Sequence, residues 1–163
     1  MRLSPLALIL ALAAAPSTAR ACSCVTVVSP ATLMLSDGKP APTMQDVEGA
    51  DVVFAGEVID VRPKPSGDPA ADQFFVAGRV TRFRVTRYWN NRVDREVTVE
   101  TGFAGGGCGF VFEKGKQYLV FARKDNKQIL TTSICTRTTS IAQVPDVWKA
   151  MIRAAGEGRK PEP

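Results

Sequence analysis

Five stretches of the chain have the hydrophobic and polar pattern of β-strands. They cover residues 50–61, 74–88, 96–101, 117–123 and 128–135. Between Glu96 and Thr101 the alternation is clean, so Val97 and Val99 are predicted to face a core and the residues between them solvent. In the second stretch Phe83 and Val85 share one predicted face, and the arginines beside them occupy the other. The pattern therefore predicts a mainly β protein.

A short helix is predicted on each side of these strands. Thr43 can cap a helix over 44–49, because Asp46 stands at the capping-box position. A second helix is predicted to begin at Pro145, and its apolar stripe consists of Val147, Trp148, Met151, Ile152 and Ala155. Gly56, in the middle of the first strand, is typical of a bulge or tight bend. We therefore expect a five-stranded Greek-key barrel of the OB type with flanking short helices and, from the cysteines considered below, two disulfides.

The start of the chain has the pattern of an export signal. Arg2 gives a basic beginning, residues 6–15 are apolar, and residues 19–21 read Ala-Arg-Ala, a small-x-small cleavage site. We therefore predict a signal peptide over 1–21 and a secreted or periplasmic mature protein. No other apolar run approaches membrane-spanning length, so no membrane span is expected.

The mature chain has the length of one domain. We assign residues 22–155 to that domain and predict that the polar segment 156–163 is a disordered tail. The net charge of the whole chain is +5, to which the signal peptide contributes two arginines and no acid. This mild excess does not require a polyanionic partner.

The sequence contains no histidine. Its absence excludes Ser-His-Asp and Cys-His catalysis, and with them the histidine-based zinc sites of hydrolases. No pair of carboxylates and no nucleophile beside a base stands out either. We therefore predict that the protein is not an enzyme and has no cofactor of its own.

Four cysteines remain after cleavage: Cys22, Cys24, Cys108 and Cys135. An even number in an exported chain predicts two disulfides, for which three connectivities exist. A bridge between Cys22 and Cys24 would be strained, so each is expected to reach a distant partner. A structural zinc site is less favoured in an exported protein. A thiol-redox role is also less favoured, because the chain has neither a Cys-x-x-Cys motif nor a histidine.

Cleavage after Ala21 would make Cys22 the first residue of the mature chain. Its α-amine and its own carbonyl could then close a five-membered chelate on a metal ion. The alternative is a lipoprotein acylated at Cys22. Ala19 stands where such signals usually have a larger aliphatic residue, and acylation would leave an odd number of cysteines, so we favour the disulfides.

Several motifs occur in an order that is more specific than any one of them. These are Cys22-Ser23-Cys24 directly after the signal peptide, Ala50-Asp51-Val52-Val53, Cys108-Gly109, Tyr118-Leu119-Val120 and Cys135. With them the chain resembles the netrin-like domain of the tissue inhibitors of metalloproteinases over nearly the whole mature sequence up to Cys135. The resemblance implies an OB barrel with bridges Cys22–Cys108 and Cys24–Cys135.

The resemblance also implies a function. In that family the amine and carbonyl of the first cysteine chelate the catalytic zinc of a target protease, and the next side chain enters its specificity pocket. Cys22 would accordingly contact the zinc of the partner, and Ser23 would be the pocket residue. The implied partner is a zinc metalloprotease, and the implied state is a monomer. The chain differs from the family in having Thr26 where a proline is usual, and in a longer span between Cys24 and Ala50.

The alternative function is a non-inhibitory, extracytoplasmic OB-fold module that binds a protein or a polyanion. Five arginines lie near aromatic residues of the second strand and the turn after it: Arg79, Arg82, Arg84, Arg87 and Arg92. Such a face can bind a nucleic acid. A solvated strand face is the better interpretation, and export makes nucleic acid an unsuitable partner, so none is expected.

Overall fold

The computed structural model describes residues 22, 24, 33–72, 77–103 and 107–162. Its helices and strands are α1 (Met44–Glu48), β1 (Val52–Lys64), α2 (Pro69–Asp72), β2 (Gly78–Tyr88), β3 (Glu96–Gly102), β4 (Gln117–Lys124), β5 (Leu130–Thr132), β6 (Thr139–Ser140) and α3 (Asp146–Ala155). In this part of the chain no helix is long and apolar enough to cross a membrane.

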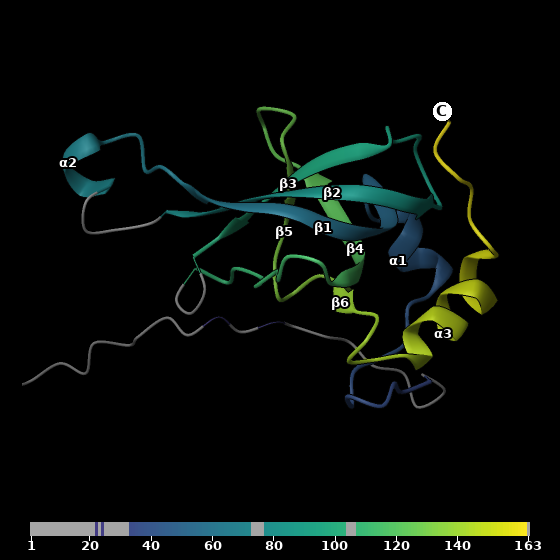
Figure 1. Ribbon diagram of the computed structural model, residues 1–163. Helices are drawn as coiled ribbons and strands as arrows, with labels where there is room; N and C mark the ends of the chain where they lie inside the picture. The colour runs from purple at the N-terminus through teal and green to yellow at the C-terminus, as the bar shows by residue number, and fades with distance from the viewer. Residues whose placement is uncertain (1–21, 23, 25–32, 73–76, 104–106, 163) are drawn as a thin grey trace, which may run out of the picture.

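Five of the strands close into a barrel. The hydrogen-bonded order is β1-β2-β3-β5-β4, and β4 pairs back onto β1. The pairing of β3 with β5 is parallel, and the other pairings in the ring are antiparallel. The predicted five-stranded Greek-key OB barrel is therefore confirmed. The short strand β6 adds to β4 outside this ring, and α1 and α3 lie at one end of it (Figure 1).

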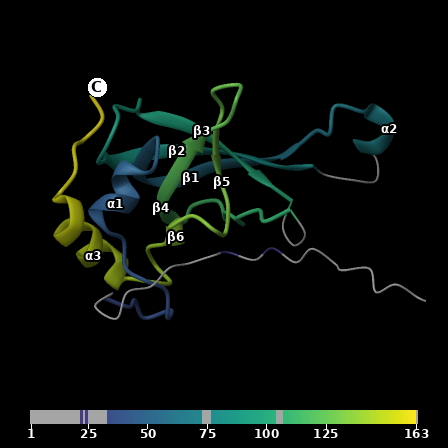
Figure 2. The same cartoon turned by 180° about the vertical axis from the view of Figure 1, so that it is seen from behind.

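Strand β1 is irregular where it pairs with β2. Its register with β2 shifts between Ala55 and Gly56, as expected for a bulge. A Cβ atom on Gly56 would lie 2.8 Å from the carbonyl oxygen of Arg84, so the close approach of the two strands requires glycine here. Beyond the barrel, β1 and β2 continue as a hairpin arm that carries α2 at its tip (Figures 1 and 2).

Two apolar clusters hold the fold together. One fills the barrel, where Phe83 packs edge-to-face against Phe54 and Phe112 at ring centroid distances of 5.2 and 4.9 Å. The other joins the helices to the outer face of β4 and includes Leu119, Val147 and Met151, each fully buried. From the apolar stripe predicted for α3, Val147, Met151 and Ala155 belong to this cluster together with Ala150, whereas Trp148 and Ile152 are half-buried outside it.

The predicted elements differ from the structure mainly at the end of the sheet. Instead of a strand over 128–135, β5 covers Leu130–Thr132 only. Gln128 belongs to the preceding turn, with φ of 64°, and the chain turns again before Cys135. Strand β6, with two residues, is too short to be recognised from alternation.

The segment Gly156–Glu162, for which a disordered tail is predicted, is mostly exposed but contacts the end of β2 and the residues just beyond it. Arg159 and Tyr88 exchange two backbone hydrogen bonds of 2.8 and 2.7 Å, and the guanidinium of Arg159 lies 5.0 Å from the Tyr88 ring centre. The indole N–H of Trp89 donates to the carbonyl of Gly156 at 2.7 Å. These partners lie at the end of β2 and just beyond it, far from the tail in the sequence.

Candidate functional site

Two disulfides hold the predicted start of the mature chain. Cys22 is bonded to Cys108 and Cys24 to Cys135, with Cα–Cα distances of 5.4 and 5.1 Å. Both distances are normal for disulfides. The residue count left three pairings open, and the structure has the one that the resemblance implies. None of the four cysteines is free.

The cysteine partners lie in two loops at the same end of the barrel. Cys108 lies in the loop between β3 and β4, and Cys135 in the turn between β5 and β6. The amide of Ile134 donates to the carbonyl of Cys108 at 3.0 Å, which joins the two loops directly. At the base of the first loop Gly109 has no room for a side chain, since a Cβ atom there would lie 1.9 Å from the carbonyl oxygen of Gly102.

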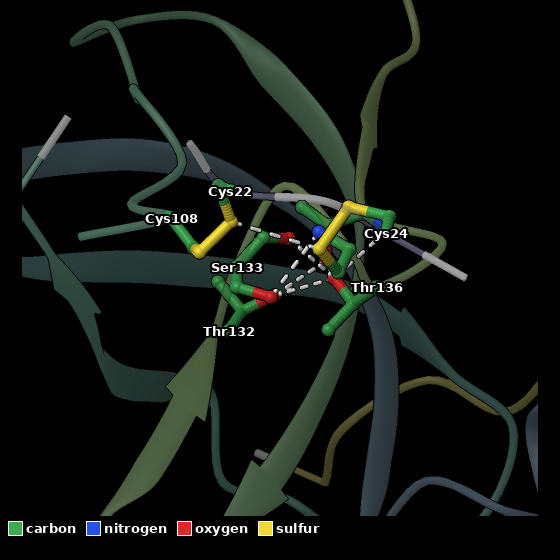
Figure 3. Close-up of a disulfide and its surroundings, with 8 residues drawn as sticks. Cys22, Cys24, Cys108, Thr132, Ser133 and Thr136 are labelled. Carbon is green, nitrogen blue, oxygen red and sulfur yellow. Dashed lines mark hydrogen bonds between the residues drawn. A yellow bond between two sulfur atoms is a disulfide. The ribbon is translucent and has the colours of Figure 1, made fainter. Parts of the chain in front are cut away.

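A network of hydroxyl groups supports the turn that carries Cys135. The hydroxyl of Thr138 lies 2.7 Å from that of Thr132 and accepts the amide of Phe121 at 3.0 Å. Thr136 is hydrogen-bonded to both of these hydroxyls. Ser133 then accepts the amide of Cys135 at 3.2 Å. Figure 3 shows Thr132, Ser133 and Thr136 next to the bridges. The hydrogen bonds of the network fix the position of the turn.

Nothing in the strand pattern indicates this network. Its signal in the sequence is the density of hydroxyl residues between 131 and 140, of which only 131–135 fall within the predicted strand 128–135. Such side chains can replace backbone partners in a tight turn. The same density explains why β5 is shorter than predicted.

The two bridges touch each other. Cys22 Sγ lies 3.9 Å from Cys135 Sγ, which belongs to the other disulfide. Both sulfurs are bridged and carry no proton, so this is a van der Waals contact. Cys24 and Cys135 are exposed, whereas Cys22 and Cys108 are half-buried. All four sulfurs are therefore gathered on a small area of the surface (Figure 3).

Exposed apolar side chains lie close to the bridges along the chain. Ile134 precedes Cys135, Val111 follows Cys108 by three residues, and Phe103 accepts a backbone hydrogen bond from Gly109. Their exposed fractions are 46, 49 and 47%. We call these three residues and the four cysteines the disulfide ridge.

A groove of about 830 Å³ adjoins the exposed bridge, and α1 forms one of its walls. In the groove Arg137 Nε donates to Asp46 Oδ1 at 3.1 Å, while Asp46 also accepts the hydroxyl and the amide of Thr43. Burial opposes the ionisation of Asp46, but the hydrogen bonds from Thr43 and Arg137 outweigh it and lower its pKa. The contact ties α1 to the segment that follows Cys135.

The structure describes only some of the predicted site residues. Cys22 lies on the barrel end in its predicted bridge, whereas Ser23 and Thr26 lie outside the described residues. The same holds for residues 104–106 of the loop before Cys108. In the described ranges no group of three or more histidine, cysteine, aspartate or glutamate residues could hold a metal ion.

The arginine face of β2 is not a uniform positive surface. Arg82 lies 3.6 Å from Glu96, and Arg84 lies 4.0 Å from Glu57. Further along, Arg92 lies 2.6 Å from Glu162 of the tail. These pairs are exposed and add little stability, but they offset much of the positive charge that a polyanion would need.

Comparison with known proteins gives no family assignment. No family model matches the chain, and no curated protein matches it.

Proposed function

We propose that this protein is an exported inhibitor of zinc metalloendopeptidases, and that it binds the catalytic zinc of its target through the α-amine and carbonyl of Cys22. The observation that carries the proposal is the attachment of both Cys22 and Cys24, the predicted first and third residues of the mature chain, to two loops at one end of the barrel. A chain start normally frays. Two bridges within three residues instead hold it in one place, as a rigid inhibitor requires.

The chemistry of the terminus fits a protease zinc. A catalytic zinc has three protein ligands and an open position occupied by water. An α-amine titrates near pH 8, and coordination favours its neutral form. Once the signal peptide is removed after Ala21, the amine and carbonyl of Cys22 can displace the water together. Ser23 would then enter the pocket beside the zinc.

The surface around Cys22 supports the same proposal. Phe103, Val111 and Ile134 are exposed apolar side chains in the two loops that carry Cys108 and Cys135, and they are available for contact with a protease. The alternative, a module that binds a polyanion through Arg82 and Arg84, has less support, because these arginines lie beside carboxylates.

Carbamylation of the terminus tests the proposal. Cyanate near neutral pH reacts preferentially with an α-amine, whose pKa is about 8, over lysine side chains near 10.4. After such treatment, and with modification at Cys22 verified by peptide mass, inhibition of a panel of zinc endopeptidases is expected to fall at least about a hundredfold. The fold, followed by circular dichroism, should not change.

The matched control replaces Arg82 and Arg84 together by alanine. Inhibition should persist in this variant and should depend only weakly on salt. Inhibition that survives carbamylation but disappears in the arginine variant would overturn the proposal in favour of the polyanion-binding module, whose affinity falls steeply with salt.

A further inference from the structure

The contact between the two disulfides places them where thiol–disulfide exchange can pass from one to the other. A disulfide exchanges when a thiolate attacks one of its sulfurs, and a new disulfide forms as the other sulfur leaves. Cys135 Sγ lies 3.9 Å from Cys22 Sγ. If Cys135 became a thiolate, it would already touch the neighbouring bridge.

The two bridges differ in access. Both cysteines of the Cys24–Cys135 bridge are exposed, whereas both cysteines of the Cys22–Cys108 bridge are half-buried. Exchange with an external thiol depends on access to the sulfur that is attacked. A small thiol therefore reaches the Cys24–Cys135 bridge first.

We propose that the Cys24–Cys135 bridge is a modification site for low-molecular-weight thiols and passes the exchange on to the Cys22–Cys108 bridge. The external thiolate attacks Cys24 Sγ, forms a mixed disulfide there, and releases Cys135 as a thiolate. Cys135 then attacks Cys22 Sγ, which forms a Cys22–Cys135 bond and releases Cys108 as a thiolate that takes a proton from water. One thiol is consumed and one thiol, at Cys108, is gained.

The backbone at Cys108 has an unusual conformation. Its φ of 56° lies in the left-handed region, which is unfavourable for a residue with a side chain. The hydrogen bond from Ile134 to the Cys108 carbonyl keeps the two loops together during the exchange. Cys22 stays attached to the barrel, now through Cys135, and the inference does not depend on protease inhibition.

Two single substitutions, Cys24→Ser and Cys135→Ser, form a matched pair. Each removes the exposed bridge and leaves one thiol, but only Cys24→Ser leaves the thiol that touches Cys22. The full mature variants are held at pH 8 without oxygen, quenched with acid, alkylated and mapped by mass spectrometry. We expect a Cys22–Cys135 disulfide in Cys24→Ser that is at least tenfold more abundant than any rearranged disulfide in Cys135→Ser.

The rate should also rise about tenfold per pH unit below the thiol pKa, because the thiolate is the attacking species. A Cys24→Ser variant that keeps its native circular dichroism and only the Cys22–Cys108 disulfide would overturn the proposal.

The wild-type protein provides a test that needs no variant. With about one equivalent of reduced glutathione, the first modified species should carry glutathione on Cys24 and an alkylated thiol on Cys108, together with a Cys22–Cys135 bridge. Glutathione found first on Cys22 or Cys108, or an alkylated thiol that remains on Cys135, would contradict the relay.

Discussion

At the scale of single residues, the buried threonines differ in what their hydroxyl groups contact. Thr81 is fully buried in the barrel, and its hydroxyl has no hydrogen-bond partner among the described residues. Thr138 is 3% exposed, and its hydroxyl is bonded to Thr132 and to the amide of Phe121. Burying a hydroxyl without a partner costs roughly 1–3 kcal/mol, whereas a satisfied one is stabilising.

Replacement of each threonine by valine, which has nearly the same shape, should therefore change the free energy of unfolding differently at the two positions. Thr138→Val is expected to destabilise the protein by about 1–3 kcal/mol, because it leaves the amide of Phe121 unpaired in the core. Thr81→Val should be neutral or stabilising. Urea unfolding of the oxidised proteins measures both free energies. Equal losses of stability in the two variants would contradict this assignment of partners.

Only part of this residue-level detail could be predicted from the sequence. Two bridges could be predicted, because the number of cysteines is known without any information about which residues lie close together. The role of Asn90 could not be predicted: its side chain accepts the amide of Val53 and donates to the carbonyls of Val47 and Ala50. These partners lie about forty residues away, and nothing in the local sequence indicates them.

At the scale of elements, alternation matches β2, where buried and exposed residues alternate between Thr81 and Thr86. Strands β1 and β4 are instead buried on both faces over residues 52–56 and 118–122, because the barrel interior lies on one side and the helices cover the other. The capping box predicted at Thr43 and Asp46 is present and begins α1 as expected. The sequence pattern failed where side chains or distant segments replace regular pairing. The hydroxyl network shortens β5, and the tail after α3 pairs with Tyr88 although its composition is typical of disorder.

The link between α1 and the turn after Cys135 should make stability depend on pH. The pKa of Asp46 is lowered in the folded protein, so the folded state binds fewer protons there than the unfolded chain. The stabilisation by its carboxylate is complete above the unfolded pKa, near 3.9, and is lost as the pH falls through the folded value. Asp46→Asn should thus be less stable than wild type at pH 6, and the difference should shrink below about pH 4.

Denaturant unfolding of both proteins between pH 3 and 6 measures this difference. Asp60→Asn is a suitable comparison, because Asp60 pairs with Arg62 on the exposed hairpin arm and should change stability little. A difference between wild type and Asp46→Asn that stays constant over the whole range would show that the carboxylate of Asp46 does not contribute in this way.

At the scale of the whole molecule, the fold brings together parts of the chain that are 86 and 111 residues apart. The barrel supplies two adjacent loops, and the bridges fasten Cys22 and Cys24 to them. The pattern of five strands with flanking helices predicted the barrel, and the resemblance predicted the pairing of the cysteines. The contact between the bridges and the support beneath them depend on how the loops pack, so the sequence could not predict them.

Zinc chelation depends on the position of the Cys22 α-amine, and the addition of one residue before Cys22 tests this dependence. A single alanine before Cys22 in the mature protein moves the amine by about 3.5 Å and leaves every side chain in place. Stability should barely change, because the bridges and barrel are untouched. Zinc coordination tolerates errors of only a few tenths of an ångström, so inhibition of zinc endopeptidases is expected to fall by orders of magnitude. Equal inhibition by the extended and the unextended protein would contradict zinc chelation by Cys22.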